Sequence, residues 1–520
     1  MRPIFLLVVV SLLLVTVRAN MPQQRDVCIL GSGASGMFAL SELYKRGYSV
    51  QLFEQNDVIG GYCNTETFQA PPGAPINTLE IGVQEFSDTK LLTEVGFGNW
   101  MLDFKAWALT FLPAYQVISF DLTHPEGGNT FLTDLKLGLQ FPTPTANPNQ
   151  TLAFEQAFEV FFAIVSQYPW LDSTVYPDPI PAELLVPFSD FIVAHNLQAM
   201  TRIFQPLLFV GGMGHYANIT TLYALKNMHR GVLALFSVPG SGITLLNGCG
   251  SLYNAVRNYV GYDKVITGVT VLDASRHECW NHQGHGEHDD FFHHGDGGCE
   301  HNDDSMVALT VKLPSGEYQS YSCGSLFVTF APVMSQAQSG WGGWNSNIAF
   351  LHPDQHELNI LSKVQHRAYY AFEVNVAGPA AAGAFNIYNL DPQNYDGLPV
   401  FPAISALQRT IPYGPAAGWA SADTDLSIDQ ITAVIADQLT RMPATVLNQT
   451  SLVTVVSHVP FQPHFSVADL SVSPSPYTRL AQLQGYRDTY WLGSMLTFAE
   501  SVMVMEHALR LINATFPPLI

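Results

Sequence analysis

Residues 27–36 read Val-Cys-Ile-Leu-Gly-Ser-Gly-Ala-Ser-Gly, and this stretch decides the fold. The run Val27–Leu30 is apolar without interruption, which is typical of a parallel strand buried on both faces. Glycines then follow at the spacing G-x-G-x-x-G, and residues 37–46 have helical periodicity before Gly47. The order strand, glycine turn and helix predicts a dinucleotide-binding unit of the Rossmann type.

Each glycine of the turn has a steric reason. Gly31 permits the tight turn, Gly33 lets the backbone approach a pyrophosphate, and Gly36 lets the helix pack on the strand. The helix start stabilises the bound anion. Glu54 ends a second strand, 49–53, where a carboxylate can accept hydrogen bonds from a ribose hydroxyl. The residues expected to contact the dinucleotide here are Gly31, Gly33, Ala34, Ser35, Gly36 and Glu54.

The continuation of this unit favours FAD over NAD. Gly60-Gly61 follows Glu54 by six residues, and residues 77–86 read Asn-Thr-Leu-Glu-Ile-Gly-Val-Gln-Glu-Phe. Both patterns resemble the flavin amine oxidase superfamily, whose members bind FAD. The resemblance implies that Gly60 and Gly61 turn close to the cofactor phosphates.

In that superfamily the end of the chain returns to the flavin. Residues 488–494 have the pattern of a buried strand that ends at Gly493-Ser494, and residues 500–511 have the pattern of a helix. The resemblance implies that the helix start points its amides at the flavin. Many relatives carry Gly-Glu where this chain has Gly493-Ser494, so that contact differs here. The further cofactor contacts implied are Val265, Gly493, Ser494, Ser501 and Val502.

The segment 209–236 carries a narrower resemblance. Residues 211–218 read Gly-Gly-Met-Gly-His-Tyr-Ala-Asn, and residues 222–226 read Leu-Tyr-Ala-Leu-Lys. They resemble the FAD-dependent polyunsaturated fatty acid isomerases, in which Gly-Tyr-Gly-His-Phe-x-Asn precedes a Tyr-x-Leu-Lys helix. Shorter matches lie at 187–191, 463–466 and 483–489, so that the resemblance covers close to half of the chain.

The isomerase resemblance implies four residues at the substrate. Phe236 falls where an aromatic residue lies over the fatty-acid entrance. Lys105 is the base nearest to the position of the arginine that pairs with the substrate carboxylate, although lysine lacks the bidentate fork of arginine. His215 and His464 are either structural hydrogen-bond donors or groups that orient the substrate.

The two resemblances imply an α/β fold with a discontinuous Rossmann-like FAD-binding domain, a mixed α+β substrate domain and a helical cap. Residues 152–170 and 188–209 have the pattern of two cap helices with apolar core faces. The expected division is a signal peptide at 1–19, an FAD-binding domain at 25–95, 237–340 and 478–520, a substrate domain at 96–150 and 341–477, and the cap at 151–236.

Composition limits the partners. Only 12% of the 520 residues are charged, and 43 acidic against 22 basic residues give a net charge of -21. Nucleic acid is excluded as a partner, because phosphate binding requires clustered Lys and Arg. Residues 4–16 are too short to span a membrane, so residues 1–19 predict a cleaved signal peptide, a mature net charge of -23, a secreted protein and no integral membrane segment.

Four sequons agree with passage through a secretory pathway, at Asn149, Asn218, Asn448 and Asn513. Six cysteines are few for a chain of this length. Cys28 and Cys63 lie in segments that we expect to be buried, where a free apolar thiol is the ordinary state.

Residues 277–304 are rich in histidine and aspartate and lie between two expected strands of the FAD-binding domain. We expect a solvated hairpin tip, closed by a disulfide between Cys279 and Cys299. The alternative is a Zn or Cu site, for which His282, His285 and His288 are the candidate ligands, although no defined zinc spacing is present.

The leading functional hypothesis is redox-neutral isomerisation of a polyunsaturated fatty acid, in which flavin N5 takes a hydride from a bis-allylic carbon and returns it to another carbon. The first alternative is a secreted amine or amino-acid oxidase that produces hydrogen peroxide. That class commonly uses a lysine near N5, and the sequence offers no assignable one. The second alternative is a secreted carrier of metal or lipid without catalytic activity.

Overall fold

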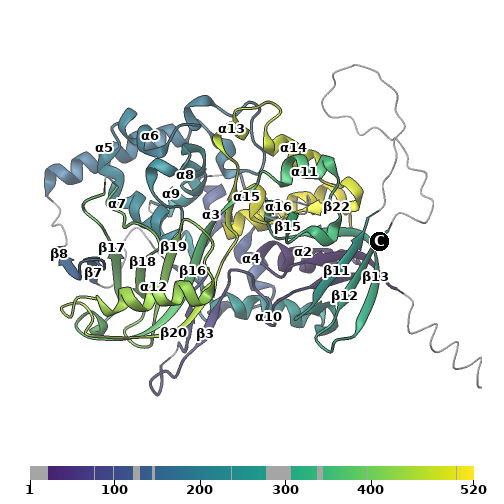
Figure 1. The fold of residues 1–520 in the computed structure, drawn as a ribbon, viewed down its shortest axis with the longest axis horizontal. Coiled ribbons are helices and arrows are strands. Elements are labelled where there is room, and N and C mark those ends of the chain that lie inside the picture. The colour runs from purple at the N-terminus through teal and green to yellow at the C-terminus, as the bar shows by residue number, and fades with distance from the viewer. Residues whose placement is uncertain are drawn as a thin grey trace, which may run out of the picture.

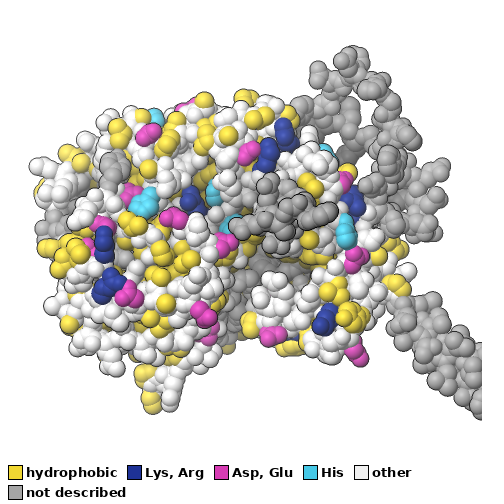
Figure 2. Space-filling view, viewed as in Figure 1, with side chains coloured by type: hydrophobic (Ala, Val, Ile, Leu, Met, Phe, Trp, Pro, Cys, Tyr) yellow, Lys and Arg dark blue, Asp and Glu magenta, His cyan; other side chains and the backbone are white. Residues whose placement is uncertain are grey.

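Two large sheets and a helical cap form the part of the chain that the computed structural model describes (Figure 1). The described residues are 22–74, 76–97, 99–120, 129–142, 147–235, 237–276, 306–336, 344–394, 396–498 and 500–519. Charged side chains are sparse on the face shown in Figure 2, and both signs are interspersed among polar and apolar groups.

The first sheet contains the glycine turn and draws its strands from three distant parts of the chain. Its order is β10-β2-β1-β13-β12-β11, and β22 pairs with β13. The pairs among β10, β2, β1, β13 and β22 are parallel, whereas β11 and β12 add an antiparallel edge. The strands are β1 (Gln23–Leu30), β2 (Val50–Phe53), β10 (Val265–Ile266), β11 (Thr270–Ser275), β12 (Val307–Lys312), β13 (Tyr318–Val328) and β22 (Thr489–Trp491).

Strand β1 is buried on both faces, as its apolar run predicts, because Val27, Cys28 and Ile29 are fully buried. On one face Val27 and Ile29 pack with the helices α2 (Ala34–Lys45), α10 (Gly248–Val260) and α16 (Ser501–Thr515). On the other face Cys28 and Leu30 belong to the core that extends into the cap. Amino-terminal and carboxy-terminal helices therefore cover the same face of one sheet.

The second sheet has the order β20-β16-β19-β18-β17-β7-β8, and β21 pairs with β16. Helix α12 (Ile428–Thr440) packs on one face through Ile431, Ile435 and Leu439, and it lies in front of the sheet in Figure 1. On the other face Trp419 donates a hydrogen bond to the Ile81 carbonyl at 3.2 Å. The strands are β7 (Asn129–Asp134), β8 (Leu139–Phe141), β16 (Gln365–Ala377), β17 (Phe385–Asn389), β18 (Ala403–Arg409), β19 (Ala416–Ala422), β20 (Gln449–Ser457) and β21 (Phe461–His464).

The cap differs from the sequence prediction. The helix expected at 188–209 is broken after α6 (Phe188–Ala194), where Asn196 has φ 55°, a left-handed conformation that asparagine tolerates. The chain continues as α7 (Thr201–Phe204) and a π-helical turn at Gln205–Val210, which contains a proline. The other cap helices are α5 (Pro148–Val165), α8 (Thr221–Asn227) and α9 (Arg230–Ala234).

Smaller elements connect these layers. Strands β5, β9 and β6 form one small sheet, and β3–β4 and β14–β15 form two hairpins. Their bounds, with those of the short helices, are β3 (Thr65–Thr67), β4 (Thr78–Glu80), β5 (Phe86–Ser87), α3 (Thr89–Glu94), α4 (Phe104–Leu109), β6 (Val117–Phe120), β9 (Gly242–Leu245), β14 (Met334–Gln336), β15 (Trp344–Ser346), α11 (Gln355–Leu361), α13 (Val467–Leu470), α14 (Pro476–Gln482) and α15 (Ser494–Thr497).

Two disulfides overturn the expectation of free buried thiols. Cys28 bonds to Cys323, and Cys63 bonds to Cys249. The first pair joins β1 to β13, which are parallel neighbours, and the two Cα atoms lie 5.7 Å apart. The expectation was wrong because the partners are 295 and 186 residues apart in the sequence, so only the tertiary fold brings them together.

Three predictions concern residues outside the described part of the chain: the signal peptide at 1–19, the disulfide between Cys279 and Cys299, and the metal ligands His282, His285 and His288. Within the described ranges, no helix is both long and apolar enough to cross a membrane. The four sequon asparagines, Asn149, Asn218, Asn448 and Asn513, are all exposed.

Candidate functional site

The glycine turn after β1 has no room for a side chain at Gly31 or at Gly36. Gly31 has φ 101°, and a Cβ atom added to it would lie 2.6 Å from the Thr329 hydroxyl oxygen. A Cβ atom on Gly36 would lie 2.1 Å from the Gly31 carbonyl oxygen. A Cβ atom on Gly61 would lie 2.8 Å from the Gly33 Cα atom. The two glycine turns therefore meet backbone to backbone, as a site for phosphate groups requires.

Glu54 joins these two turns. Its Oε2 atom accepts hydrogen bonds from the Ser32 amide at 2.8 Å and the Ser32 hydroxyl at 2.6 Å, and its Oε1 atom accepts one from the Asn56 amide. The Ser32 hydroxyl in turn accepts a hydrogen bond from the Gly60 amide. Glu54 thus positions both turns, and Oε1 keeps acceptor capacity for a ribose hydroxyl. Sequence reasoning missed Ser32.

The far end of the chain reaches the same place. Gly493, with φ 83°, lies two residues after the end of strand β22, and a Cβ atom on it would lie 2.6 Å from the Thr329 carbonyl oxygen and 3.7 Å from the Ser35 hydroxyl oxygen. Ser494 begins α15 beside this contact. Val265 lies in β10, the strand next to the end of β2. Thr329, which the sequence did not mark, contacts both glycine segments.

The start of α16 differs in detail from the expectation. The Glu500 carboxylate caps the helix, because it accepts hydrogen bonds from the Val502 amide at 3.2 Å and the Met503 amide at 2.5 Å. Burial raises the pKa of Glu500, and the charges of His229 and Lys226 oppose that shift. The Val502 amide, expected to face a flavin, therefore already has an acceptor. Ser501 is the first residue of this helix.

This arrangement fits an FAD. At Gly31, Gly36 and Gly61 a Cβ atom would lie less than 3 Å from another atom, Gly33 lies against Gly61, and the chain presents a carboxylate at the end of β2. The residues that would hold the phosphates and ribose are those of the two glycine turns and Glu54, and Gly493 with Ser494 would close the other side.

Three tyrosines lie beside α15, of which Tyr223 and Tyr477 are buried and Tyr176 is half-buried. The rings of Tyr176 and Tyr477 stack at 3.6 Å, and the Tyr477 hydroxyl donates to the Tyr223 hydroxyl at 3.0 Å. The Tyr176 hydroxyl donates to the Leu496 carbonyl, and the ring of Tyr223 stacks on Phe498 at 5.0 Å. Burial raises the pKa of Tyr223, so the phenol is neutral at ordinary pH. Only Tyr223 carried a sequence signal, as part of Leu-Tyr-Ala-Leu-Lys.

Lys226 is buried next to Tyr176. Its ammonium donates to the carbonyls of Leu171, at 2.9 Å, and Ser173, and it lies 4.8 Å from the ring centroid of Tyr176. Burial lowers the pKa of Lys226 to about 7, although the charges of Asp172 and Glu500 oppose the shift. A lysine of lowered pKa in the core can act as a base.

The two predicted substrate histidines have different partners. His215 donates from Nδ1 to Asp396 at 3.0 Å, and this hydrogen bond raises the pKa of the imidazole. His464 donates from Nδ1 to the Gln462 carbonyl at 2.9 Å, and burial lowers its pKa to about 4. The ring of His464 lies 5.6 Å from that of Tyr223. His464 is thus a neutral group beside the tyrosines.

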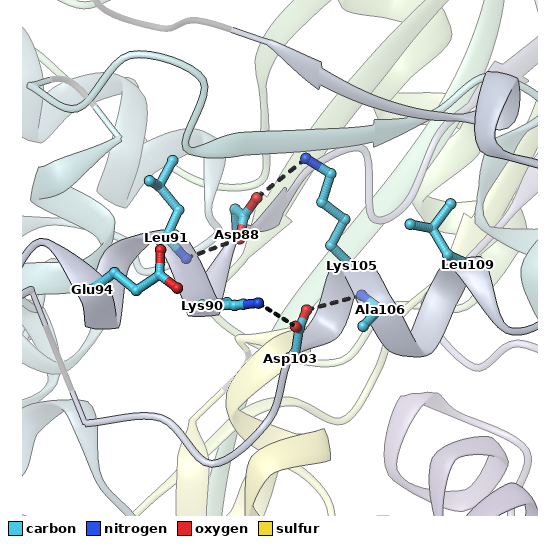
Figure 3. A pocket seen from close by; sticks show the side chains of 8 residues that line it. All are labelled: Asp88, Lys90, Leu91, Glu94, Asp103, Lys105, Ala106 and Leu109. Carbon is cyan, nitrogen blue, oxygen red and sulfur yellow. Dashed lines mark hydrogen bonds and ion pairs between the residues drawn. The ribbon is translucent and has the colours of Figure 1, made fainter.

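Lys105 lies away from the tyrosines, in a surface hollow of about 270 Å³ (Figure 3). Its ammonium is 3.4 Å from Asp88 Oδ2 and 2.8 Å from the Ser119 hydroxyl. Glu94 and Asp103 also line the hollow. The ammonium of Lys90 lines the hollow as well and lies 3.9 Å from Asp103 Oδ2, so three carboxylates surround two ammonium groups and disfavour the binding of a further carboxylate. Phe236 lies outside the described residues.

Comparisons with known proteins agree with this geometry. Residues 29–94 match the model of the NAD(P)-binding Rossmann-like domain. The chain is 29% identical to an uncharacterised protein of Acanthamoeba polyphaga mimivirus over 98% of each chain. It is 25% identical to the beta-cyclopiazonate dehydrogenase of Aspergillus flavus, over 91% of this chain and 90% of that one. Other fungal relatives are named FAD-dependent oxidoreductases.

Solved structures share the whole fold. A fatty acid isomerase from P. acnes that produces CLA superposes with a TM-score of 0.63 at 15% identity, covering 95% of this chain and 99% of that one. A putrescine oxidase superposes with a TM-score of 0.58 at 14% identity, covering 95% and 100%. The expected fold class is confirmed, and the chain is an FAD-dependent oxidoreductase-type enzyme with the flavin amine oxidase-like fold and FAD as its cofactor.

Proposed function

We propose that this enzyme isomerises a polyunsaturated fatty acid, moving methylene-interrupted double bonds into conjugation without net oxidation. The observation that carries the proposal is a junction beside α15. There the Tyr223 hydroxyl accepts a hydrogen bond from the Phe465 amide at 2.7 Å, and Gln462 donates to the Gly211 carbonyl at 2.7 Å. Two segments that resemble the isomerases in sequence, 211–226 and 463–466, thus meet next to the flavin-binding domain.

The side chains at this junction suit contact with a hydrocarbon chain. Phe498, Tyr477 and Phe465 are each less than 5% exposed, and the neighbouring side chains of Tyr223 and His464 are neutral. A neutral aromatic wall excludes water and leaves an apolar chain free of competing ionic contacts.

The chemistry requires little from the side chains. FAD, when bound, supplies reversible hydride transfer at its N5 atom. A bis-allylic C–H bond is weak, because the carbon left behind is delocalised over two alkenes. The tyrosines and His464 therefore have to position the alkenes and exclude water, and no side-chain nucleophile is needed.

Secretion is part of the proposal. Residues 1–19 have the pattern of a signal peptide, and two disulfides connect distant parts of the described chain. Disulfides persist in oxidising compartments and are rare in the cytosol. The four exposed sequon asparagines support the same conclusion, and we propose that they carry glycans.

A second candidate function is the oxidation of an amine, with hydrogen peroxide as the second product. Lys226 favours it, since a buried lysine with a pKa near 7 is the group that the sequence alone did not offer for this chemistry. Its ammonium is however held by two backbone carbonyls, which makes a structural role the simpler interpretation.

An anaerobic assay tests the proposal. The purified protein should be yellow, and incubation with arachidonate without oxygen should raise the ultraviolet absorbance of conjugated dienes or trienes without peroxide. Tyr223→Leu should lower this rate, whereas the control Tyr262→Leu, at a residue 62% exposed, should not. Oxygen-dependent turnover of amines, with no change in arachidonate, would transfer the assignment to an amine oxidase.

A further inference from the structure

Arg367, near the start of β16, is a half-buried guanidinium without a carboxylate partner. Its Nη2 atom donates to the Asn218 carbonyl at 2.9 Å, and within the described ranges no carboxylate lies within ion-pair distance. Arg409 offers a contrast, because three backbone carbonyls accept hydrogen bonds from its two Nη atoms. Those carbonyls occupy three of the four Nη N–H groups of Arg409, whereas the Asn218 carbonyl occupies one of the four of Arg367.

Arg367 lies between the two isomerase-like segments. A Cβ atom added to Gly214 would lie 3.7 Å from its Nη1 atom, so the loop 211–218 passes directly over the guanidinium. On the other side Arg367 pairs in register with Phe461 of strand β21. Its charge also contributes to the lowered pKa of His464. Arg367 thus borders the junction beside α15.

The acids near Arg367 do not neutralise it by contact. Asp396 is bound by His215 at 3.0 Å and also accepts the Tyr216 amide. Asp423 is exposed and attracts both Arg367 and His215 without contacting the guanidinium. A positive charge without a carboxylate contact therefore lies at the edge of the aromatic junction, where a substrate carboxylate could accept hydrogen bonds from the remaining N–H groups of Arg367.

A path of neutral rings leads from this charge to α15. The His464 ring lies 5.6 Å from Tyr223, and the Tyr223 ring stacks on Phe498 at 5.0 Å. Phe498 directly follows α15, whose preceding Gly493 contacts the first glycine turn through Thr329. Charge at one end and aromatic rings toward the cofactor site match a molecule with an anionic head and an apolar tail.

We propose that Arg367 binds the carboxylate of the substrate, with the hydrocarbon tail lying along His464 and Tyr223. This inference rests on the proposed function and assigns the anchor that Lys105 was expected to provide. Arg367 has the planar donor fork that suits a carboxylate, and Lys105 lies in the acidic surface hollow instead.

Steady-state kinetics with arachidonate and its methyl ester test the assignment. Arg367→Gln should raise KM for the acid about 10- to 100-fold, because a charge-assisted hydrogen-bonded pair is lost. It should leave kcat within about twofold and leave KM for the ester unchanged, and Arg367→Lys should recover part of the loss. The control Arg441→Gln, at a surface ion pair with Asp437, should behave like the wild type.

Equal effects on acid and ester, or no effect on either, would overturn the inference.

A binding measurement separates this failure from failure of the proposed function. Oleate and oleyl alcohol should perturb the flavin absorbance of the intact enzyme, and Arg367→Gln should weaken only the response to oleate. If the wild type converts no fatty acid but shows this selective loss, the anchor stands and the reaction is wrong. If oleate and oleyl alcohol perturb the flavin absorbance equally in the wild type and in Arg367→Gln, the assignment of Arg367 as the anchor is wrong. FAD content and the unfolding midpoint identify a variant that fails to fold, for which Arg367→Lys is the substitute.

Discussion

The dinucleotide turns and the aromatic junction beside α15 are built in opposite ways. In the turns, backbone approaches backbone: Gly36 and Gly61 each lie so close to another chain segment that a Cβ atom would be less than 3 Å from it. At the junction, side chains from three distant segments meet, through Tyr176, Tyr223 and Tyr477. The first region depends on the absence of side chains, and the second depends on their exact fit.

The difference has an energetic consequence. A backbone contact of about 2 Å cannot relax, because both partners are fixed by sheet and helix hydrogen bonds. Packed rings can shift rotamers and so spread the effect of a substitution over several side chains. Single substitutions there should therefore reduce stability and activity less, and by amounts that depend on the neighbouring side chains. Substitutions should therefore be all-or-none at the turns and graded at the junction, and the experiments below test that contrast.

The largest effect is expected from Gly36→Ala. The added methyl would lie 2.1 Å from the Gly31 carbonyl oxygen, so helix α2 would have to move off β1. We expect loss of bound FAD and a lower unfolding midpoint, measured by flavin absorbance per chain and by thermal unfolding. Gly383→Ala is the matched control, because nothing lies within 4 Å of its Cβ position. Retention of FAD by Gly36→Ala would contradict the steric account.

The same contrast explains what could be predicted from the sequence. The turns were predicted because a backbone site leaves glycines at fixed spacing, as at Gly31, Gly33 and Gly36. Strand β22 and helix α16 were predicted because their apolar periodicity is local. These elements position the cofactor, and most of the Rossmann-like fold follows from them.

The junction could not be predicted in the same way. Arg367 sits in an ordinary strand pattern, and nothing near it in the sequence marks it as unpaired. Its lack of a carboxylate partner depends on the tertiary fold, which brings the charge of Asp423 near Arg367 without contact and pairs Asp396 with His215. The disulfides escaped prediction for the same reason, since proximity of Cys28 to Cys323 depends on the pairing of β1 with β13.

A buried ion pair between the edge of the first sheet and α11 gives the next largest effect. Arg276 follows β11, and its Nη1 and Nη2 atoms bind Glu357 of α11 at 2.6 and 2.8 Å. Arg276→Met would leave a buried carboxylate with Arg487 as its remaining cation, at 3.4 Å. We expect a loss of about 3–5 kcal/mol in the free energy of unfolding by urea.

The control for this ion pair is Arg441→Met, whose pair with Asp437 is on the surface and should cost less than about 1 kcal/mol. The double variant Arg276→Met/Glu357→Leu should recover part of the loss, because no unpaired charge remains. A cost for Arg276→Met as small as that of the surface control would show that the pair does not stabilise the attachment of α11 to the first sheet.

The disulfide between Cys63 and Cys249 should have a smaller effect, about 2–4 kcal/mol. It joins the segment directly after Gly60-Gly61 to α10, so replacing both cysteines by serine should weaken FAD retention as well as stability. Urea unfolding and flavin release measure both quantities. Replacement of Cys279 and Cys299, which lie outside the described residues, is the control and should leave FAD retention unchanged. Free thiols at Cys63 and Cys249 in unreduced peptides would exclude the bond.

The smallest effect is expected at His215, which lies in the loop 211–218 beside Arg367. The hydrogen bond to Asp396 raises the pKa of His215 above its usual 6.5 in the folded state. The stabilisation is therefore complete below about pH 6.5 and is lost as the pH rises through the raised value. His215→Gln should lower the free energy of unfolding by about 1 kcal/mol at pH 5.5 and by less at pH 8.5, in urea unfolding at each pH.

Asp396→Asn should remove the same pH-dependent part of the free energy of unfolding, and the double variant should lose little more stability than either single variant. A cost for His215→Gln that is constant from pH 5.5 to 8.5 would mean that packing against Phe401, whose ring lies 5.2 Å away, and not the ion pair, holds this loop over Arg367.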